Sequence, residues 1–215
     1  MSQATLHYIF DPFCGWCYAA APLVDAATTL PGLTVALHGG GMLAGAQRRQ
    51  IDTEWRGYVM PHDERIAQLS GQPFGEAYFE GLLRDLSYVM DSAQPIAAIL
   101  AADALNGQGL AMLHRLQIAH YQEGQRISDT PVLSQLAAEL GHDQAAFAQA
   151  LSDAQGATTE AHINAARNLL RQVGGQGFPT LALAHSNGQW QVLPSSQYLG
   201  QVDDWLAFLR QQLGA

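Results

Sequence analysis

The chain contains 215 residues with a formal net charge of −9, and its ten basic side chains are all arginines. Nucleic acids and anionic membranes bind clusters of basic residues, so this composition argues against both as partners. Hydrophobic residues make up 48% of the chain, which predicts one medium-sized domain, or one domain with a large insertion, around a sizeable core.

The N-terminus, Met1-Ser2-Gln3-Ala4, leads directly into the first predicted strand. It carries neither the basic nor the apolar region of a secretory signal, and no apolar run approaches the roughly 18 residues of a membrane span. We therefore expect a cytoplasmic protein without a membrane segment. Disulfides in that compartment are usually transient and catalytic. No feature of the sequence indicates an oligomeric state.

The predicted fold begins with a strand, a helix and a second strand. Thr5–Phe10 is rich in β-branched and aromatic residues, Tyr18–Leu30 is Ala-rich with apolar residues at helical spacing, and Leu33–His38 again resembles a strand. Such β-α-β units nearly always place their strands in parallel. The glycines at 39–41 lack the residues of a phosphate-binding loop and predict a turn that permits close backbone approach.

Strand patterning nearly disappears from Leu43 to Val173, and five to seven helices are predicted there. They cover Arg48–Met60 ending at Pro61, Glu76–Val89, a helix capped by Ser92 that continues to Leu105, Leu110–Gln122, Val132–Leu140, a helix from about Asp143 to Ser152, and one capped by Thr158 or Thr159 that ends at Gln172.

The C-terminal part returns to strands. Leu181–Ala184 and Gln189–Leu193 flank Asn187-Gly188, a strong hairpin signal, and Asp203–Leu213 is an amphipathic helix. The order β-α-β, helices, β-β-α predicts an α/β protein with the thioredoxin fold and a large all-helical insertion. We place the thioredoxin-like domain at residues 1–42 and 174–215 and the insertion at 43–173.

Cys14 and Cys17, the two cysteines of the chain, lie where the first strand leads into the first helix. Free N–H groups and the helix dipole favour an anion at this position, so the pKa of the Cys14 thiol is expected below the free value of about 8.5. Cys17, one helical turn later, is placed to attack a mixed disulfide on Cys14. The pair predicts thiol–disulfide exchange.

A metal site or a structural disulfide suits the cysteine pair less well. A zinc site needs four ligands, yet there is no second cysteine pair, and His114 and His120 are too far apart in sequence for a His-x₃₋₅-His motif. A structural disulfide across four residues would remove little chain entropy. The alternative that both cysteines are buried and inert stays open, although their strand-to-helix position argues against it. We predict no metal.

Two motifs carry a family resemblance, Asp11-Pro12-Phe13-Cys14-Gly15-Trp16-Cys17 and Gly177-Phe178-Pro179-Thr180. With them the chain resembles the DsbA-like thioredoxin superfamily, and more narrowly its cytosolic members described as predicted protein-disulfide isomerases. The resemblance implies that Cys14 is the nucleophile and Cys17 the resolving thiol. It also implies a cis peptide bond before Pro179, with Phe178, Pro179 and Thr180 facing the substrate.

The dipeptide between the cysteines departs from the Pro-His of the secreted oxidases. A histidine can stabilise a thiolate by its charge, whereas Trp16 cannot. We therefore expect a moderately lowered thiol pKa and a more reducing potential than that of a strong oxidase. Trp16 either offers an apolar surface to the substrate or is a partly exposed core residue. Whether the protein oxidises, reduces or isomerises disulfides stays open.

The predicted function is that of a thiol–disulfide oxidoreductase or isomerase acting on protein or small-molecule disulfides and dithiols. No cofactor is required, and glutathione is a candidate co-substrate. The main alternative is a glutathione-dependent transferase or isomerase like the kappa-class transferases and hydroxychromene-carboxylate isomerases, which share this fold but generally have serine in place of Cys14. A second alternative is a redox-sensing or chaperone-like binding protein.

Overall fold

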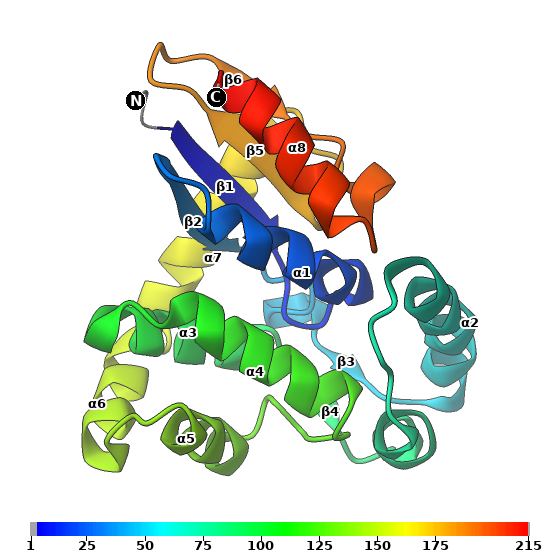
Figure 1. Cartoon of the computed structure of the whole chain (residues 1–215). Helices are drawn as coiled ribbons and strands as arrows, with labels where there is room; N and C mark the ends of the chain where they lie inside the picture. The colour runs from blue at the N-terminus through cyan, green and yellow to red at the C-terminus, as the bar shows by residue number, and fades with distance from the viewer. Residues whose placement is uncertain (1–3, 215) are drawn as a thin grey trace.

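The computed structural model describes residues 4–214, which contain a mixed four-stranded sheet in the order β2-β1-β5-β6 (Figure 1). Strand β1 (Ala4–Phe10) pairs in parallel with β2 (Leu33–Gly39). On its other side β1 pairs antiparallel with β5 (Thr180–Ala184), which pairs antiparallel with β6 (Trp190–Val192). The residues Met1–Gln3, which entered the prediction of compartment, lie outside the described part of the chain.

Helices cover both faces of this sheet. Helices α1 (Gly15–Thr28) and α8 (Val202–Leu213) lie together on one face, while α7 (Ala157–Gln172) lies on the other beside β2 (Figure 1). The fully buried Trp205 joins the first two, because its indole N–H donates a hydrogen bond to the carbonyl of Leu23 at 2.9 Å.

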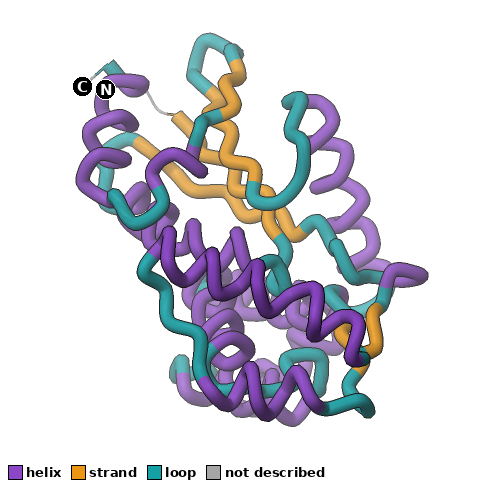
Figure 2. The backbone as a smooth tube through the Cα atoms, turned by 90° about the vertical axis from the view of Figure 1, so that its right-hand side faces the viewer, coloured by secondary structure: helices purple, strands orange, loops and turns teal. Residues whose placement is uncertain are grey.

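The remaining helices form a layer beyond one end of the sheet, as Figure 2 shows. They are α2 (Thr53–Ser70), α3 (Ala93–Asn106), α4 (Gly109–Tyr121), α5 (Thr130–Glu139) and α6 (Gln144–Ala154). Short strands β3 (Arg49–Gln50) and β4 (Val89–Met90) pair antiparallel beside them. The element order confirms the predicted α/β class with a helical insertion, although β3 and β4 show that the insertion is not all-helical as predicted. The exact boundaries at residues 42–43 and 173–174 stay a prediction.

The prediction that a helix runs from Arg48 and ends at Pro61 is wrong. Helix α2 begins after the cap Asp52, whose carboxylate accepts a hydrogen bond from the backbone N–H of Trp55, and it continues through Pro61 to Ser70. A proline inside a helix removes one backbone hydrogen bond and costs about 3 kcal/mol. Burial of Ile66 on the inner face helps to offset this cost, so tertiary packing overrides the local signal.

The predicted helix over Glu76–Val89 is also wrong as a continuous element. A π-helical turn at Ala77–Gly81 and a 3₁₀ turn at Leu82–Arg84 take its place, and the chain then enters β4. Gly81 interrupts the path with φ −102° and ψ −82°, outside the helical region. Helix α7 begins after Gly156, so neither Thr158 nor Thr159 is its cap.

Candidate active site

Cys14 occupies the cap position of α1, directly after the loop that follows β1. Its backbone is extended, and its Sγ accepts a hydrogen bond from the backbone N–H of Cys17 at 3.3 Å. The helix begins at Gly15, three residues earlier than the predicted Tyr18, so Cys14 caps its first turn and Cys17 lies within that turn. An N–H donor and the positive end of the helix therefore face the Cys14 sulfur.

Cys17 lies fully buried beneath Cys14, whose side chain is also largely buried at 6% exposed. Burial first, and then the interaction with Cys14, raises the pKa of the Cys17 thiol well above its ordinary range. Both residues are free thiols in the structure. The environment thus keeps Cys17 protonated and leaves Cys14 as the sulfur that an incoming group reaches first.

The loop before β5 brings the second motif to Cys14. The carbonyl oxygen of Phe178 lies 3.4 Å from the Cys14 Sγ, which donates a hydrogen bond to it across 164 residues of sequence. The peptide bond between Phe178 and Pro179 is cis. Thr180 begins β5 opposite Ile9, and its hydroxyl donates to the carbonyl of Gly177 at 2.7 Å.

The turn after β2 makes room for this loop. A Cβ atom on Gly40 would lie 2.2 Å from the ring of Phe178, so the predicted close approach at the triple glycine is present. Arg167 of α7 supports the same turn, because its guanidinium donates hydrogen bonds to the carbonyls of Gly40 and Gly41 at 2.8 and 2.5 Å. Helix α7 thus supports the turn that packs against Phe178.

Two cavities share Trp16 and Phe178 in their linings, and Cys14 lines the second of them. The first, here called the sheet-side cavity, has a volume of about 260 Å³ and is lined by Trp16, Phe178, Pro179 and Thr180 together with residues of the β6–α8 connection such as Ser195. It contains the four residues predicted to face the substrate. Their contact with a substrate stays a prediction.

The second, here called the insert-side cavity, measures about 460 Å³ and opens between Cys14, α2 and α4. Trp16 and Phe178 line both cavities and form the wall between them. Trp16 is partly exposed, which agrees with either of the two roles considered for it.

A buried carboxylate in the insert-side cavity was missed by the sequence analysis. Asp63 of α2 is 6% exposed, its Oδ2 accepts a hydrogen bond from the hydroxyl of Tyr78 at 2.8 Å, and burial raises its pKa to about 6. A Cβ atom on Gly15 would lie 2.8 Å from the Asp63 Oδ1. This carboxylate therefore sits against the residue next to Cys14. In sequence it looks like any acid on a polar helix.

Asp11 ties the loop that carries the cysteines to the insertion. Its Oδ1 accepts hydrogen bonds from the Phe13 N–H at 2.9 Å and the Ser92 hydroxyl at 3.0 Å, and its Oδ2 accepts one from the Met42 N–H at 2.5 Å. Burial raises the pKa of Asp11 to about 6 despite these donors. Ser92 precedes α3 as predicted, yet its hydroxyl bonds to Asp11 rather than capping the helix.

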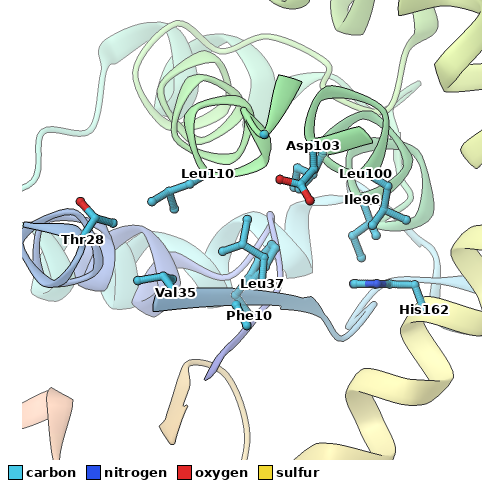
Figure 3. Close-up of a pocket in the computed structure, with 12 residues that line it drawn as sticks. Phe10, Thr28, Val35, Leu37, Ile96, Leu100, Asp103, Leu110 and His162 are labelled. Carbon is cyan, nitrogen blue, oxygen red and sulfur yellow. The ribbon is translucent and has the colours of Figure 1, made fainter. Parts of the chain in front are cut away.

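Another cavity, of about 430 Å³, lies at the free edge of β2 and contains neither cysteine. Figure 3 shows Val35 and Leu37 of β2 facing Ile96 and Leu100 of α3 across it. Within the described residues, no group of three or more His, Cys, Asp or Glu side chains is arranged to hold a metal ion. Over the same residues, no helix has both the length and the apolar character to cross a membrane.

Comparison with known proteins identifies relatives over nearly the whole chain. The sequence profile of the DSBA-like thioredoxin domain matches residues 5–206. The structure of the cytosolic disulfide reductase DsbM from Pseudomonas aeruginosa is 55% identical, covers 97% of this chain and 98% of its own, and superposes with a TM-score of 0.91. A structure of the same protein with GSH is 52% identical, covers 98% of this chain and 100% of its own, and has a TM-score of 0.89.

A more distant structure, a putative protein disulfide isomerase from Nitrosomonas europaea, is 21% identical with a TM-score of 0.80 over 99% of this chain and 100% of its own, and shows the fold alone. The search of curated proteins finds no match. The predicted resemblance and the predicted class of enzyme, a DsbA-like oxidoreductase, are confirmed. The chain belongs to the DSBA-like thioredoxin domain family.

Proposed function

We propose that the protein is a cytosolic disulfide reductase in which Cys14 attacks the substrate and glutathione restores the dithiol. The observation that carries the proposal is the position of the Cys14 sulfur, between the N–H of Cys17 at 3.3 Å and the carbonyl of Phe178 at 3.4 Å. The direction of the reaction and the use of glutathione are supported by similarity to the reductase DsbM and to its structure with GSH.

The reaction proceeds by two exchanges at Cys14. Its thiolate attacks one sulfur of the substrate, the substrate S–S bond breaks, and the leaving thiolate takes a proton from solvent. Cys17 then loses its proton and attacks the Cys14 sulfur, which releases the second thiol and leaves a Cys14–Cys17 disulfide. Two molecules of glutathione reduce this disulfide and are released as one molecule of oxidised glutathione.

The two sulfurs have different roles in this reaction. The raised pKa of Cys17 keeps it protonated in the resting dithiol, so it does not compete as a nucleophile. The sheet-side cavity, with Trp16, Phe178, Pro179 and Thr180, accommodates one half of the substrate disulfide. The Phe178 carbonyl, 3.4 Å from the Cys14 Sγ, lies beside the reacting sulfur.

The proposal is tested by glutathione-linked reduction of bis(2-hydroxyethyl) disulfide and of insulin. We expect wild-type turnover, loss of turnover to background in Cys14→Ser, and a trapped mixed disulfide in Cys17→Ser, detected by mass spectrometry. Glutathione conjugation of an electrophile that survives Cys14→Ser would instead favour the transferase alternative. A dithiol that changes state without turnover would favour the redox-sensing alternative.

A further inference from the structure

The insert-side cavity is lined by an acidic side chain and by no arginine. The acidic side chain is Asp63, while most of the remaining wall is apolar or aromatic. The whole chain has a net charge of −9, so the surrounding field has the same sign. A positively charged group is the partner that such a wall favours.

Two other polar side chains of the cavity, Tyr78 and His120, offer no positive charge to Asp63. The hydroxyl of Tyr78 is already donated to Asp63 Oδ2, and the ring of His120, whose pKa burial lowers to about 3, is neutral. The Nδ1 atom of His120 has no hydrogen-bond partner. Asp63 is more than nine-tenths buried, no arginine lines the cavity, and the exposed His62 of the same helix is a basic side chain in its lining. Desolvated carboxylates of this kind are costly unless they are paired.

The position of Asp63 beside Gly15 limits what would pair with it. Its Oδ1 lies against Gly15, the residue after Cys14, because a Cβ atom there would be 2.8 Å away. A group that bonds to Asp63 while its sulfur bonds to Cys14 therefore has its charge only a few bonds from that sulfur.

We infer that the insert-side cavity binds one half of a disulfide substrate and that Asp63 selects substrates with an ammonium group close to the disulfide. This inference rests on the proposed reductase function and names the substrate class of that same site. Cystamine, with an ammonium two carbons from each sulfur, is the simplest such compound.

The step remains a two-electron exchange. The Cys14 thiolate forms a bond to one cystamine sulfur, the cystamine S–S bond breaks, and cysteamine leaves with a proton from solvent. Cys17 then displaces the second cysteamine from Cys14. The enzyme dithiol is oxidised to a disulfide, cystamine is reduced to two cysteamine molecules, and no further reactant is needed.

The test is a single-turnover oxidation of the reduced protein, followed by loss of free thiols. Cystamine, the neutral bis(2-hydroxyethyl) disulfide and the anionic dithiodiglycolate are compared at pH 7.5 and at about 0.15 M salt, where long-range charge effects are screened beyond about 8 Å. The readout is the ratio of the cystamine rate to the neutral rate in each variant, because the intrinsic reactivities of the disulfides then cancel.

Asp63→Asn keeps the shape of the side chain and removes its charge. We expect the ratio to fall about tenfold or more, as for the loss of a charge-assisted hydrogen bond. Glu64→Gln is the matched control, since Glu64 is the exposed neighbour on the same helix and does not line the cavity. It removes the same charge and should leave the ratio unchanged.

A comparison of the three disulfides on the wild-type protein tests the inference without any variant. Relative to their reactions with free glutathione, cystamine should be favoured and dithiodiglycolate disfavoured. Equal relative rates for the three disulfides, or an equal fall of the ratio in Asp63→Asn and Glu64→Gln, would overturn the inference and leave the reductase function standing. Failure of all three disulfides to oxidise the wild-type dithiol would instead contradict the reductase function itself.

Discussion

Gly15, between the two cysteines, packs directly against helix α2 of the insertion. The space that its side chain would need is occupied by Asp63 Oδ1 and by the Cδ1 of Ile66, at 2.8 and 2.9 Å from the Cβ position. The Asp63 oxygens cannot move freely because Tyr78 holds one of them. The small residue at this position therefore follows from packing of α2 against the start of α1.

Gly15→Ala should lower the free energy of unfolding by about 1–2 kcal/mol, because an added methyl group overpacks this contact. The measurement is urea denaturation at pH 7. Gly57→Ala is a suitable control, since Gly57 also lies in a helix and has open space at its Cβ position. There the higher helix propensity of alanine should raise stability by about 0.5–1 kcal/mol. Destabilisation of the same size at both positions would contradict the packing argument.

At the scale of elements, the Asp11 carboxylate connects three segments. It accepts hydrogen bonds from the loop before α1 through Phe13, from the segment after β2 through Met42, and from the start of α3 through Ser92. Ser92 extends this connection, because its hydroxyl also accepts a hydrogen bond from the N–H of Leu43 at 3.0 Å. The loop that carries Cys14 is thus attached to the insertion by buried polar contacts.

Ser92→Ala should destabilise the protein by about 1–3 kcal/mol, because it leaves the Leu43 N–H and one Asp11 oxygen with a partner fewer in a buried site. Thermal and chemical unfolding measure this loss. Ser152→Ala, on the exposed face of α6, should change stability by less than about 0.5 kcal/mol. Should Ser92→Ala be as harmless as Ser152→Ala, the connection through Asp11 contributes nothing to stability.

For the whole molecule, buried titratable groups make stability depend on pH in opposite directions. Burial lowers the pKa of His120 to about 3 from 6.5, so the folded state binds fewer protons there and stability falls as pH drops through this range. Burial raises the pKa of Asp11 and of Asp63 to about 6 from 3.8. Their contribution is present at low pH and is lost as pH rises from 3.8 to 6.

Replacing His120 separates its contribution to the pH dependence of stability from those of Asp11 and Asp63. The difference in unfolding free energy between wild type and His120→Phe should shift by about 3 kcal/mol between pH 7 and pH 4, with wild type losing stability relative to the variant. This value corresponds to about 1.4 kcal/mol for each pH unit below 6.5. Denaturant unfolding at several pH values measures the shift. Parallel stability curves for the two proteins would show that His120 is protonated as readily in the folded state as in the unfolded chain.

Local sequence was enough to predict the β-α-β and β-β-α segments, the strand-to-helix position of Cys14 and Cys17, and a proline, Pro179, just before a strand. These features depend on local periodicity and on the chemistry of single residue types, which act over a few neighbours. The helix ends within the insertion were predicted poorly. Helix α2 continues through Pro61 and the chain leaves helical geometry at Gly81, because tertiary packing outweighs local propensity at both residues.

The surroundings of the Cys14 sulfur follow from long-range packing. Phe178 approaches it from 164 residues away, and Asp63 reaches the same helix end from the insertion. Nothing in the local pattern separates Asp63 from the solvent-exposed acids of its helix. Its burial follows from how α2 packs against α1, since long-range packing assigns each face of a helix to the core or to water.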